Sequence, residues 1–318
     1  HHLDDDTTTT TTTTVGTTNK NNLYNRRRAL LSFVSTPLYP TLLTTALPQP
    51  ANASTKDPKT GILLPSSGEI EHSIPATWDD EIDNPLSSGN DVQTSFARLD
   101  SSPDALFYSE PRFVEHVDDA AVETMTSYIS DRVLSKKEGE YDHDVDVDVD
   151  VLDLCSSWTS HIRNNNSSMK LKRVAGLGMN AKELRANEQL TEWTVLDLNA
   201  DANVKLPYDN DSFDVILLQL SIDYLIHPLE VLKEASRVLK KGGSVHVLFS
   251  NRLFLSKAIG LWTGSDDVDK AYTVGGYLHF CEGGFVDVEA EDLSTRVKRG
   301  KERVIVGDPV YVVRAIKG

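Results

Sequence analysis

The feature that most constrains the fold is a short apolar run, residues 151–154, which contains one acid and breaks into a loop of small residues. The run reads Val-Leu-Asp-Leu, and Cys-Ser-Ser-Trp follows it. A continuous run of this kind is typical of a strand buried on both faces of a parallel sheet. In doubly wound α/β domains, ligands bind beyond the carboxyl ends of the strands. We therefore predict a first strand ending at Leu154 and a ligand-binding turn after it.

Strand and helix patterns alternate along the rest of this region, which favours a mostly parallel sheet flanked by helices. The spacing of apolar residues predicts strands at 149–154, 172–178, 193–198, 215–218, 244–250, 284–288 and 310–316. Helices are predicted over 113–133, from 181 with Asn180 as its N-cap, from Pro228 to the Gly242-Gly243 pair, and over 253–261.

The N-terminal region has a different composition. Residues 7–14 are all Thr, and a low-complexity tract of this kind predicts no packed structure. An arginine run at 26–28 precedes a moderately apolar stretch that closes with Ala51-Asn52-Ala53, the order of a cleavable transport signal. The paired arginines resemble a twin-arginine signal, and the uncharged leader resembles that of proteins bound for the thylakoid lumen. We therefore expect a transit peptide and a plastid (chloroplast) protein; the alternative is a plain tail that contains an arginine pair.

The chain is accordingly divided into three parts: a leader and targeting signal at 1–53, an extended Pro-, Ser- and Asp-rich arm at 54–104, and an α/β domain at 105–318. The formal charge of −16 argues against nucleic-acid binding, which needs clustered cations. No apolar run is long enough to be a transmembrane segment, which leaves peripheral membrane contact open. We interpret the repeat of Asp and Val at 142–150 as a solvated connector and expect no metal. Two cysteines are too few for a disulfide framework.

Two motifs give the domain a specific resemblance. The stretch Leu206-Pro-Tyr-Asp-Asn-Asp-Ser-Phe-Asp214 and the stretch Glu234-Ala-Ser-Arg-Val-Leu-Lys-Lys-Gly-Gly243 together resemble the class I S-adenosylmethionine (SAM)-dependent methyltransferases. The resemblance covers residues 141–317. The loop at 153–158, with residues 175–180, resembles uncharacterised methyltransferase-like proteins of plants and algae. The family implies a Rossmann-like sheet in the order 3-2-1-4-5-7-6, with strand seven antiparallel.

The resemblance also implies roles for individual residues, with SAM as the cofactor. Asp153 takes the place of the strand-one acid near the methionine part of SAM. Asp197 takes the place of the acid that accepts from the adenine amino group, and Gln219 and Ser221 line the mouth where the methyl group is transferred. The implied cofactor-binding residues are Asp153, Leu154, Cys155, Ser156, Ser157, Trp158, Gly178, Met179, Asn180, Asp197, Leu198, Gln219 and Ser221.

Two positions depart from the family pattern. The loop after strand one lacks the glycines that let a backbone approach a ligand or adopt a positive φ. Gly178 stands where the family has an acid that binds both ribose hydroxyls, and Asn180 is the candidate to replace it. Loss of a hydrogen bond to a charged group costs about 1.5–3 kcal/mol, so SAM binding would weaken by roughly 10- to 100-fold.

Methyl transfer needs a base only if the acceptor must lose a proton. Asp223 and Tyr224, after strand four, are the preferred catalytic candidates, ahead of His227; their alternatives are helix capping and core packing. Asn251 and Arg252, just after strand five, are candidates to contact an acidic or polar acceptor, with a helix-start cap and a surface charge as the alternatives. Trp262 belongs either to an acceptor lid or to ordinary core.

The sequence therefore predicts a methyltransferase acting on a small-molecule or lipid-like acceptor, with the oligomeric state left open. A degenerate fold that binds a ligand or protein without methyl transfer is the first alternative. A dinucleotide-dependent oxidoreductase is the second, although the G-x-G-x-x-G motif is absent after strand one.

Overall fold

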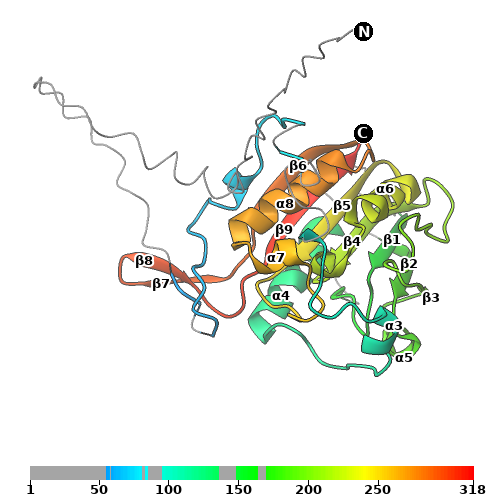
Figure 1. Cartoon of the computed structure of the whole chain (residues 1–318), viewed down its shortest axis with the longest axis horizontal. Coiled ribbons are helices and arrows are strands. Elements are labelled where there is room, and N and C mark those ends of the chain that lie inside the picture. The colour runs from blue at the N-terminus through cyan, green and yellow to red at the C-terminus, as the bar shows by residue number, and fades with distance from the viewer. Residues whose placement is uncertain (1–54, 58, 81–82, 85–94, 136–147, 164–169) are drawn as a thin grey trace, which may run out of the picture.

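The computed structural model describes residues 55–57, 59–80, 83–84, 95–135, 148–163 and 170–318 (Figure 1). The predicted targeting signal and most of the acidic repeat lie outside these residues. Within them, no helix has both the length and the apolar character needed to cross a membrane.

A seven-stranded sheet in the order β3-β2-β1-β4-β5-β9-β6 forms the centre of the domain. Its first five strands are parallel, and β9 is antiparallel to both β5 and β6. This confirms the predicted class I order, since the last strand is numbered nine only because a separate hairpin precedes it. The strands are β1 (Asp148–Leu154), β2 (Lys170–Gly178), β3 (Glu192–Val195), β4 (Phe213–Gln219), β5 (Leu239–Phe249), β6 (Phe285–Asp292) and β9 (Tyr311–Lys317). The hairpin of β7 (Arg296–Arg299) and β8 (Glu302–Ile305) projects from the domain (Figure 1).

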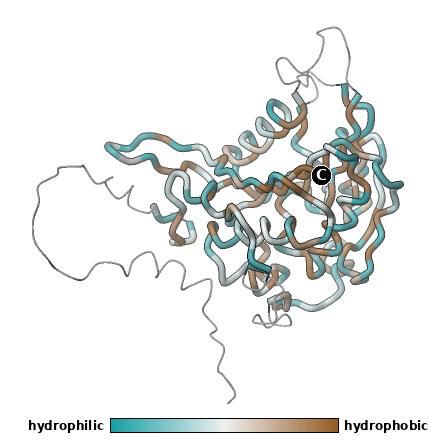
Figure 2. Tube along the Cα trace, turned by 90° about the horizontal axis from the view of Figure 1, so that it is seen from above, coloured by the Kyte–Doolittle hydropathy of each residue, from teal (hydrophilic) through white to brown (hydrophobic). Residues whose placement is uncertain are grey.

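Alternate residues of the central strands enter two different apolar layers. In β1, Leu152 and Leu154 pack with α6 (Pro228–Val238) and α8 (Asp267–Phe280), whereas Val149 and Val151 pack with α4 (Asp119–Ser127) and the π-helical turn η2 (Tyr128–Val133). Both faces of the sheet are therefore covered, which explains why the strands read as continuous apolar runs. Figure 2 shows these apolar positions gathered inside the domain.

The predicted helix over 113–133 is wrong at its start. The structure begins α4 only at Asp119, because the Asp118 carboxylate caps it by accepting from the Ala121 amide. Phe113 and Val114 are exposed and lie outside any helix. The preceding residues, which include the short helix α3 (Asp104–Phe107), instead cross the carboxyl-terminal edge of the sheet.

The helix that opens at Pro228 also ends earlier than predicted. It stops at Val238, and the Gly242-Gly243 pair lies inside β5. Gly242 has a φ of +78°, and a Cβ atom on Gly243 would lie 2.8 Å from the Asp214 carbonyl oxygen. These glycines therefore serve an irregular strand entry rather than a helix end.

The helix predicted over 253–261 is wrong as well. Only α7 (Gly260–Thr263) forms near there, and the long helix α8 follows. A Cβ atom on Gly275 of α8 would lie 2.4 Å from Ile74 Cδ1. The glycine thus lets the segment 70–80, which begins with the 3-10 turn η1 (Glu71–Ser73), pack directly against this helix.

Candidate active site

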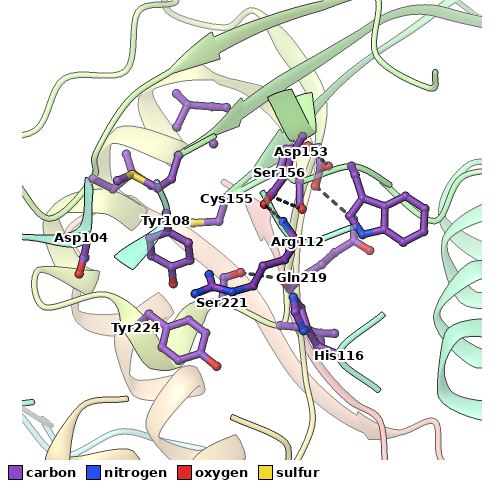
Figure 3. Close-up of a pocket in the computed structure, with 18 of the residues that line it drawn as sticks. Asp104, Tyr108, Arg112, His116, Asp153, Cys155, Ser156, Gln219, Ser221 and Tyr224 are labelled. Carbon is purple, nitrogen blue, oxygen red and sulfur yellow. Dashed lines mark hydrogen bonds between the residues drawn. The ribbon is translucent and has the colours of Figure 1, made fainter. Parts of the chain in front are cut away.

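A cleft opens at the carboxyl ends of β1, β2 and β4, the place predicted for a ligand (Figure 3). Its cavity volume is about 150 Å³. One buried water needs only ~10–15 Å³ of such space, so the cleft has room for an organic ligand. Of the implied cofactor-binding residues, it brings together Asp153, Cys155, Ser156, Ser157, Trp158, Gly178, Met179, Asp197, Leu198, Gln219 and Ser221.

The loop after β1 adopts the conformation that glycine provides in the family, but without glycine. Cys155 has a φ of +62°, in the left-handed region that costs an L-residue about 1–2 kcal/mol. His161 and Leu220, which also line the cleft, have φ values of +52° and +50°. Strained backbone of this kind gathers at functional sites, where the surrounding structure holds it in place.

The same loop explains Gly178 at the end of β2. The Ser156 amide donates to the Leu177 carbonyl oxygen at 2.7 Å, which draws the loop over the strand end. A Cβ atom on Gly178 would lie 2.1 Å from the Ser156 carbonyl oxygen. The acid expected at this position therefore cannot fit while the loop stays where it is.

Asn180 and Leu154 do not line the cleft. Asn180 caps α5 (Ala181–Ala186), because its side-chain oxygen accepts from Lys182 and Glu183 amides and its amide group donates to the Tyr108 carbonyl oxygen. This confirms the predicted N-cap, and both polar groups of the side chain are used in these hydrogen bonds. Leu154 is fully buried in the core.

Glu183, which sequence reasoning missed, is the acid that lies nearest this part of the cleft wall. It comes from the first turn of α5, and its carboxylate accepts from the Arg112 amide at 2.6 Å and from the Ser157 hydroxyl at 2.7 Å. Its side chain is buried and lines the cleft. The sequence signal for Glu183 is its place as an acid five positions after Gly178.

Asp153 is buried at the floor of the cleft and is satisfied by neutral donors. It accepts from the Ser156 hydroxyl at 2.5 Å, the Ser160 hydroxyl at 2.6 Å and the Gln219 side-chain amide at 3.1 Å. Burial raises the pKa of this carboxyl, and the three hydrogen bonds oppose the rise. Gln219 thereby becomes part of a fixed network rather than a free side chain.

The network continues to His161, a second residue that the sequence did not single out. Gln219 donates to Asp153 and to the Ser160 carbonyl oxygen, so its own side-chain oxygen must face His161 Nδ1, at 2.8 Å. His161 Nε2 lies 3.2 Å from a Glu115 carboxylate oxygen. Both ring nitrogens thus face acceptors, which favours the imidazolium. Burial lowers the pKa of His161, but the Glu115 carboxylate outweighs it and the net direction is upward.

On the other side of the cleft, Asp197 and Leu198 follow β3. The Asp197 carboxylate accepts from the Asn199 amide at 2.9 Å and keeps its second oxygen free of hydrogen bonds within the described residues. Leu198 is buried next to it. The pair presents an acceptor and an apolar surface side by side, as an adenine ring requires.

Of the two catalytic candidates, only Tyr224 lines the cleft. Its hydroxyl oxygen accepts from the Phe254 amide at 2.8 Å. Asp223, its neighbour in the 3-10 turn η3 (Ile222–Tyr224), is buried behind the wall, and one of its carboxylate oxygens has no hydrogen-bond partner among the described residues. Burial raises the pKa of Asp223 to about 7.

The other candidates lie outside the cleft. His227 is the residue before α6, and Trp262 is buried in the core. Asn251 donates a hydrogen bond to the buried carboxylate of Asp57. Arg252 forms ion pairs with Asp57 and Asp308. They hold the N-terminal arm to the domain.

The outer wall of the cleft is the segment 104–117, hereafter the strap. Hydrogen bonds or ion pairs join it to the segments that follow β1, β2 and β3. These contacts join Asp104 to Asn199, Tyr108 to Asn180, Arg112 to Glu183, Val114 to Trp158, and Glu115 to His161. The region predicted as a leading helix is therefore part of the site.

Comparison with known proteins agrees with this geometry. Residues 156–247 match a family described as a methyltransferase domain. Demethylmenaquinone methyltransferase of Bacillus subtilis (strain 168) is 28% identical over 120 residues, which are 36% of this chain and 47% of that protein. The match therefore spans about half the length of this curated relative.

Solved structures of low sequence identity are also similar. A chain from a Haloferax volcanii complex of a methyltransferase and its activator has a TM-score of 0.40 at 15% identity, with 62% of this chain and 91% of that chain covered. A SAM-dependent methyltransferase of Thermotoga maritima has a TM-score of 0.39 at 16% identity, with 63% and 90% covered. Residues 156–247 are therefore similar to a methyltransferase domain, and they lie in a sheet of the predicted class I order with a cleft at the ends of its central strands.

Proposed function

We propose that the protein is an active SAM-dependent methyltransferase whose cleft holds both the cofactor and a small-molecule or lipid-like acceptor. The observation that carries the proposal is the convergence of residues after β1, β2, β3 and β4 on one cleft. These are the positions where an open α/β sheet binds its ligand.

The residues present suit most of the cofactor. Asp197 and Leu198 supply the acceptor and apolar surface for adenine. The loop at 155–157 lines the cleft, and its Ser156 and Ser157 hydroxyls donate to Asp153 and Glu183. We assign the ribose hydroxyls to Glu183. Its carboxylate lines the cleft where Gly178 has no side chain, and each of its oxygens has a lone pair beyond the hydrogen bond it already accepts.

The cofactor supplies an electrophilic methyl group, and the chain supplies orientation. Holding the reacting atoms in line accounts for a large part of the rate in such reactions. Tyr224 and Ser221 lie after β4 and face the cleft, so we place the acceptor against them. Asp223 supports Tyr224 from behind as a positioning residue.

Titration calorimetry of the full chain with S-adenosylhomocysteine (SAH) tests cofactor binding. We expect a micromolar constant that Asp197→Ala weakens by roughly 10- to 100-fold, since a hydrogen bond to a charged group is lost. Asp209→Ala is the matched control, because Asp209 is exposed and outside the cleft. No heat at millimolar SAH would refute the proposal.

A fold that binds the cofactor or another ligand without transferring a methyl group is the second candidate. Gly178 favours it, because the loop occupies the space of the family's ribose acid. Turnover of radiolabelled SAM with an acceptor panel separates the two candidates. Demethylmenaquinone belongs in that panel because it is named for the Bacillus subtilis relative.

For the location of the protein, we propose import into plastids, to the thylakoid lumen, directed by residues 1–53. The arginine run at 26–28 and the small residues Ala51 and Ala53 support it. Import into isolated chloroplasts, with sequencing of the new N-terminus, tests this proposal. A start at Ser54 is expected, and an unprocessed, excluded chain would contradict it.

A further inference from the structure

The charges that line the cleft are almost all neutralised within the protein. Asp104 pairs with Arg98 and Lys257, and Glu115 pairs with His161. Asp153 and Glu183 accept hydrogen bonds from neighbouring donors. These four carboxylates are therefore engaged by partners from the protein itself, and Asp197 accepts from the Asn199 amide with one of its two oxygens.

Arg112 is the exception. Its side chain lines the cleft from the strap, and within the described residues no carboxylate pairs with it. Among the described parts of the chain, its guanidinium makes one hydrogen bond, the donation from Nη2 to the Phe107 carbonyl oxygen at 3.0 Å. A guanidinium has five N–H donors, so most of them remain available to a ligand.

Aromatic rings hold this guanidinium in place. It lies 4.4 Å from the ring centroid of Phe107, 5.4 Å from that of Phe254 and 5.9 Å from that of Tyr108. The rings of Phe254 and Tyr224 lie 6.0 Å apart, so the cluster reaches the loops after β4 and β5. Figure 3 shows Arg112 reaching toward Tyr108 on this side of the cleft. A flat cation over flat apolar walls suits a planar ligand that carries an anionic group.

His116 lies next to this cluster. Its ring is 5.0 Å from that of Phe254 in an edge-to-face arrangement. Partial burial and the nearby Arg112 both lower the pKa of His116, which keeps the imidazole neutral and able to accept a proton. Anion binding and proton acceptance thus occur on the same wall.

We infer that Arg112 selects a planar aromatic acceptor that carries a carboxylate next to a hydroxyl, with His116 as the proton acceptor; the inference rests on the proposed function. The acceptor hydroxyl gives its proton to His116. The oxygen forms a bond to the methyl carbon of SAM, and the methyl–sulfur bond breaks with its electron pair left on sulfur. The products are the methyl ether, SAH and a protonated His116.

The test is titration calorimetry with salicylate and with salicylamide, its uncharged amide, each with and without SAH. We expect wild type to bind salicylate roughly 10- to 100-fold more tightly, the range of one charge-assisted contact. Arg112→Gln should remove this preference, and Arg112→Lys should keep part of it. Arg185→Gln, an exposed arginine of α5 outside the cleft, is the matched control. Thermal unfolding of each variant checks that it folds.

Equal binding of the two probes by wild type, or an unchanged preference in Arg112→Gln, would overturn the inference. So would a loss of SAH binding in Arg112→Gln with unchanged binding of methylthioadenosine, which lacks the carboxylate, because Arg112 would then belong to the cofactor. If wild type binds no SAH, the proposed function fails. In that case, the preference for salicylate over salicylamide measured without SAH still tests the role of Arg112.

Discussion

The Ser156 carbonyl oxygen lies 2.1 Å from the place that a Cβ atom on Gly178 would occupy. The loop after β1 and the end of β2 are therefore fitted to each other. The glycine-free loop lies close to the end of β2, and β2 has no side chain at position 178. The two departures from the expected pattern, a loop without glycine and no acid at position 178, are therefore coupled in this structure.

Restoring a side chain at Gly178 should therefore damage the protein. Gly178→Ala forces the loop to move, and overpacking of this kind costs typically 1–3 kcal/mol. Gly178→Asp adds the family's acid and should cost at least as much without improving SAH binding. Urea unfolding measures the first effect and calorimetry the second. Gly264→Ala is the control, since its Cβ atom would meet nothing closer than 3.8 Å. Tighter SAH binding by Gly178→Asp would contradict this account.

The sheet was predictable because its information is local. Each strand is a continuous apolar run, and the motifs at 206–214 and 234–243 fix which strands lie at the centre of the sheet. The helix patterns were less secure. Helix α8 was not predicted, and its Gly275 lies inside the helix because the space it leaves is filled by Ile74 and Trp78, about two hundred positions earlier in the chain.

The site residues that sequence reasoning missed share one property. Arg112, Glu115 and His116 belong to the strap, and Glu183 and His161 contact the strap through Arg112 and Glu115. Their positions depend on hydrogen bonds between segments far apart in the sequence. An apolar helical spacing in 113–133 concealed the strap, because only the Asp118 cap fixes where the helix begins.

Cys155 should be an unusually unreactive thiol despite lining the cleft. Burial and the nearby Asp153 carboxyl raise the pKa of this thiol to about 12. At about pH 8 its thiolate fraction is then roughly a thousandfold below that of a free cysteine with a pKa of ~8.5. Iodoacetamide labelling followed by mass spectrometry should show correspondingly slow alkylation. Chain unfolded in concentrated urea should react at the ordinary rate, and fast labelling of the folded protein would contradict the prediction.

The buried Asp223 carboxyl should make the folded protein less stable at neutral pH than at acidic pH. Its pKa is raised from 3.8 to about 7 by burial, so the folded state holds the proton over a range in which the unfolded chain has released it. Unfolding free energy then falls as pH rises from about 4 to 7 and levels off above. At ~1.4 kcal/mol per pKa unit, the total is roughly 4 kcal/mol. Asp223→Asn should match wild type near pH 4 and be more stable by up to this amount above pH 7. Urea unfolding across this pH range measures the difference, and equal stability at all pH values would refute it.

His161 should also make the folded protein less stable as the pH rises. Its pKa is raised in the folded state by Glu115, so the folded protein holds the proton more tightly than the unfolded chain does. The resulting stabilisation is fully present below the ordinary histidine pKa of ~6.5 and is lost as pH rises through the higher folded value. His161→Gln should therefore cost about 1.5–3 kcal/mol in mildly acid solution, the range for a hydrogen bond to a charged group, and less as the pH increases. Urea unfolding of wild type and variant between about pH 5 and 9 measures this. Glu115→Gln should show the same trend. A cost that grows with pH would mean that His161 is neutral and that Glu115 does not hold its proton.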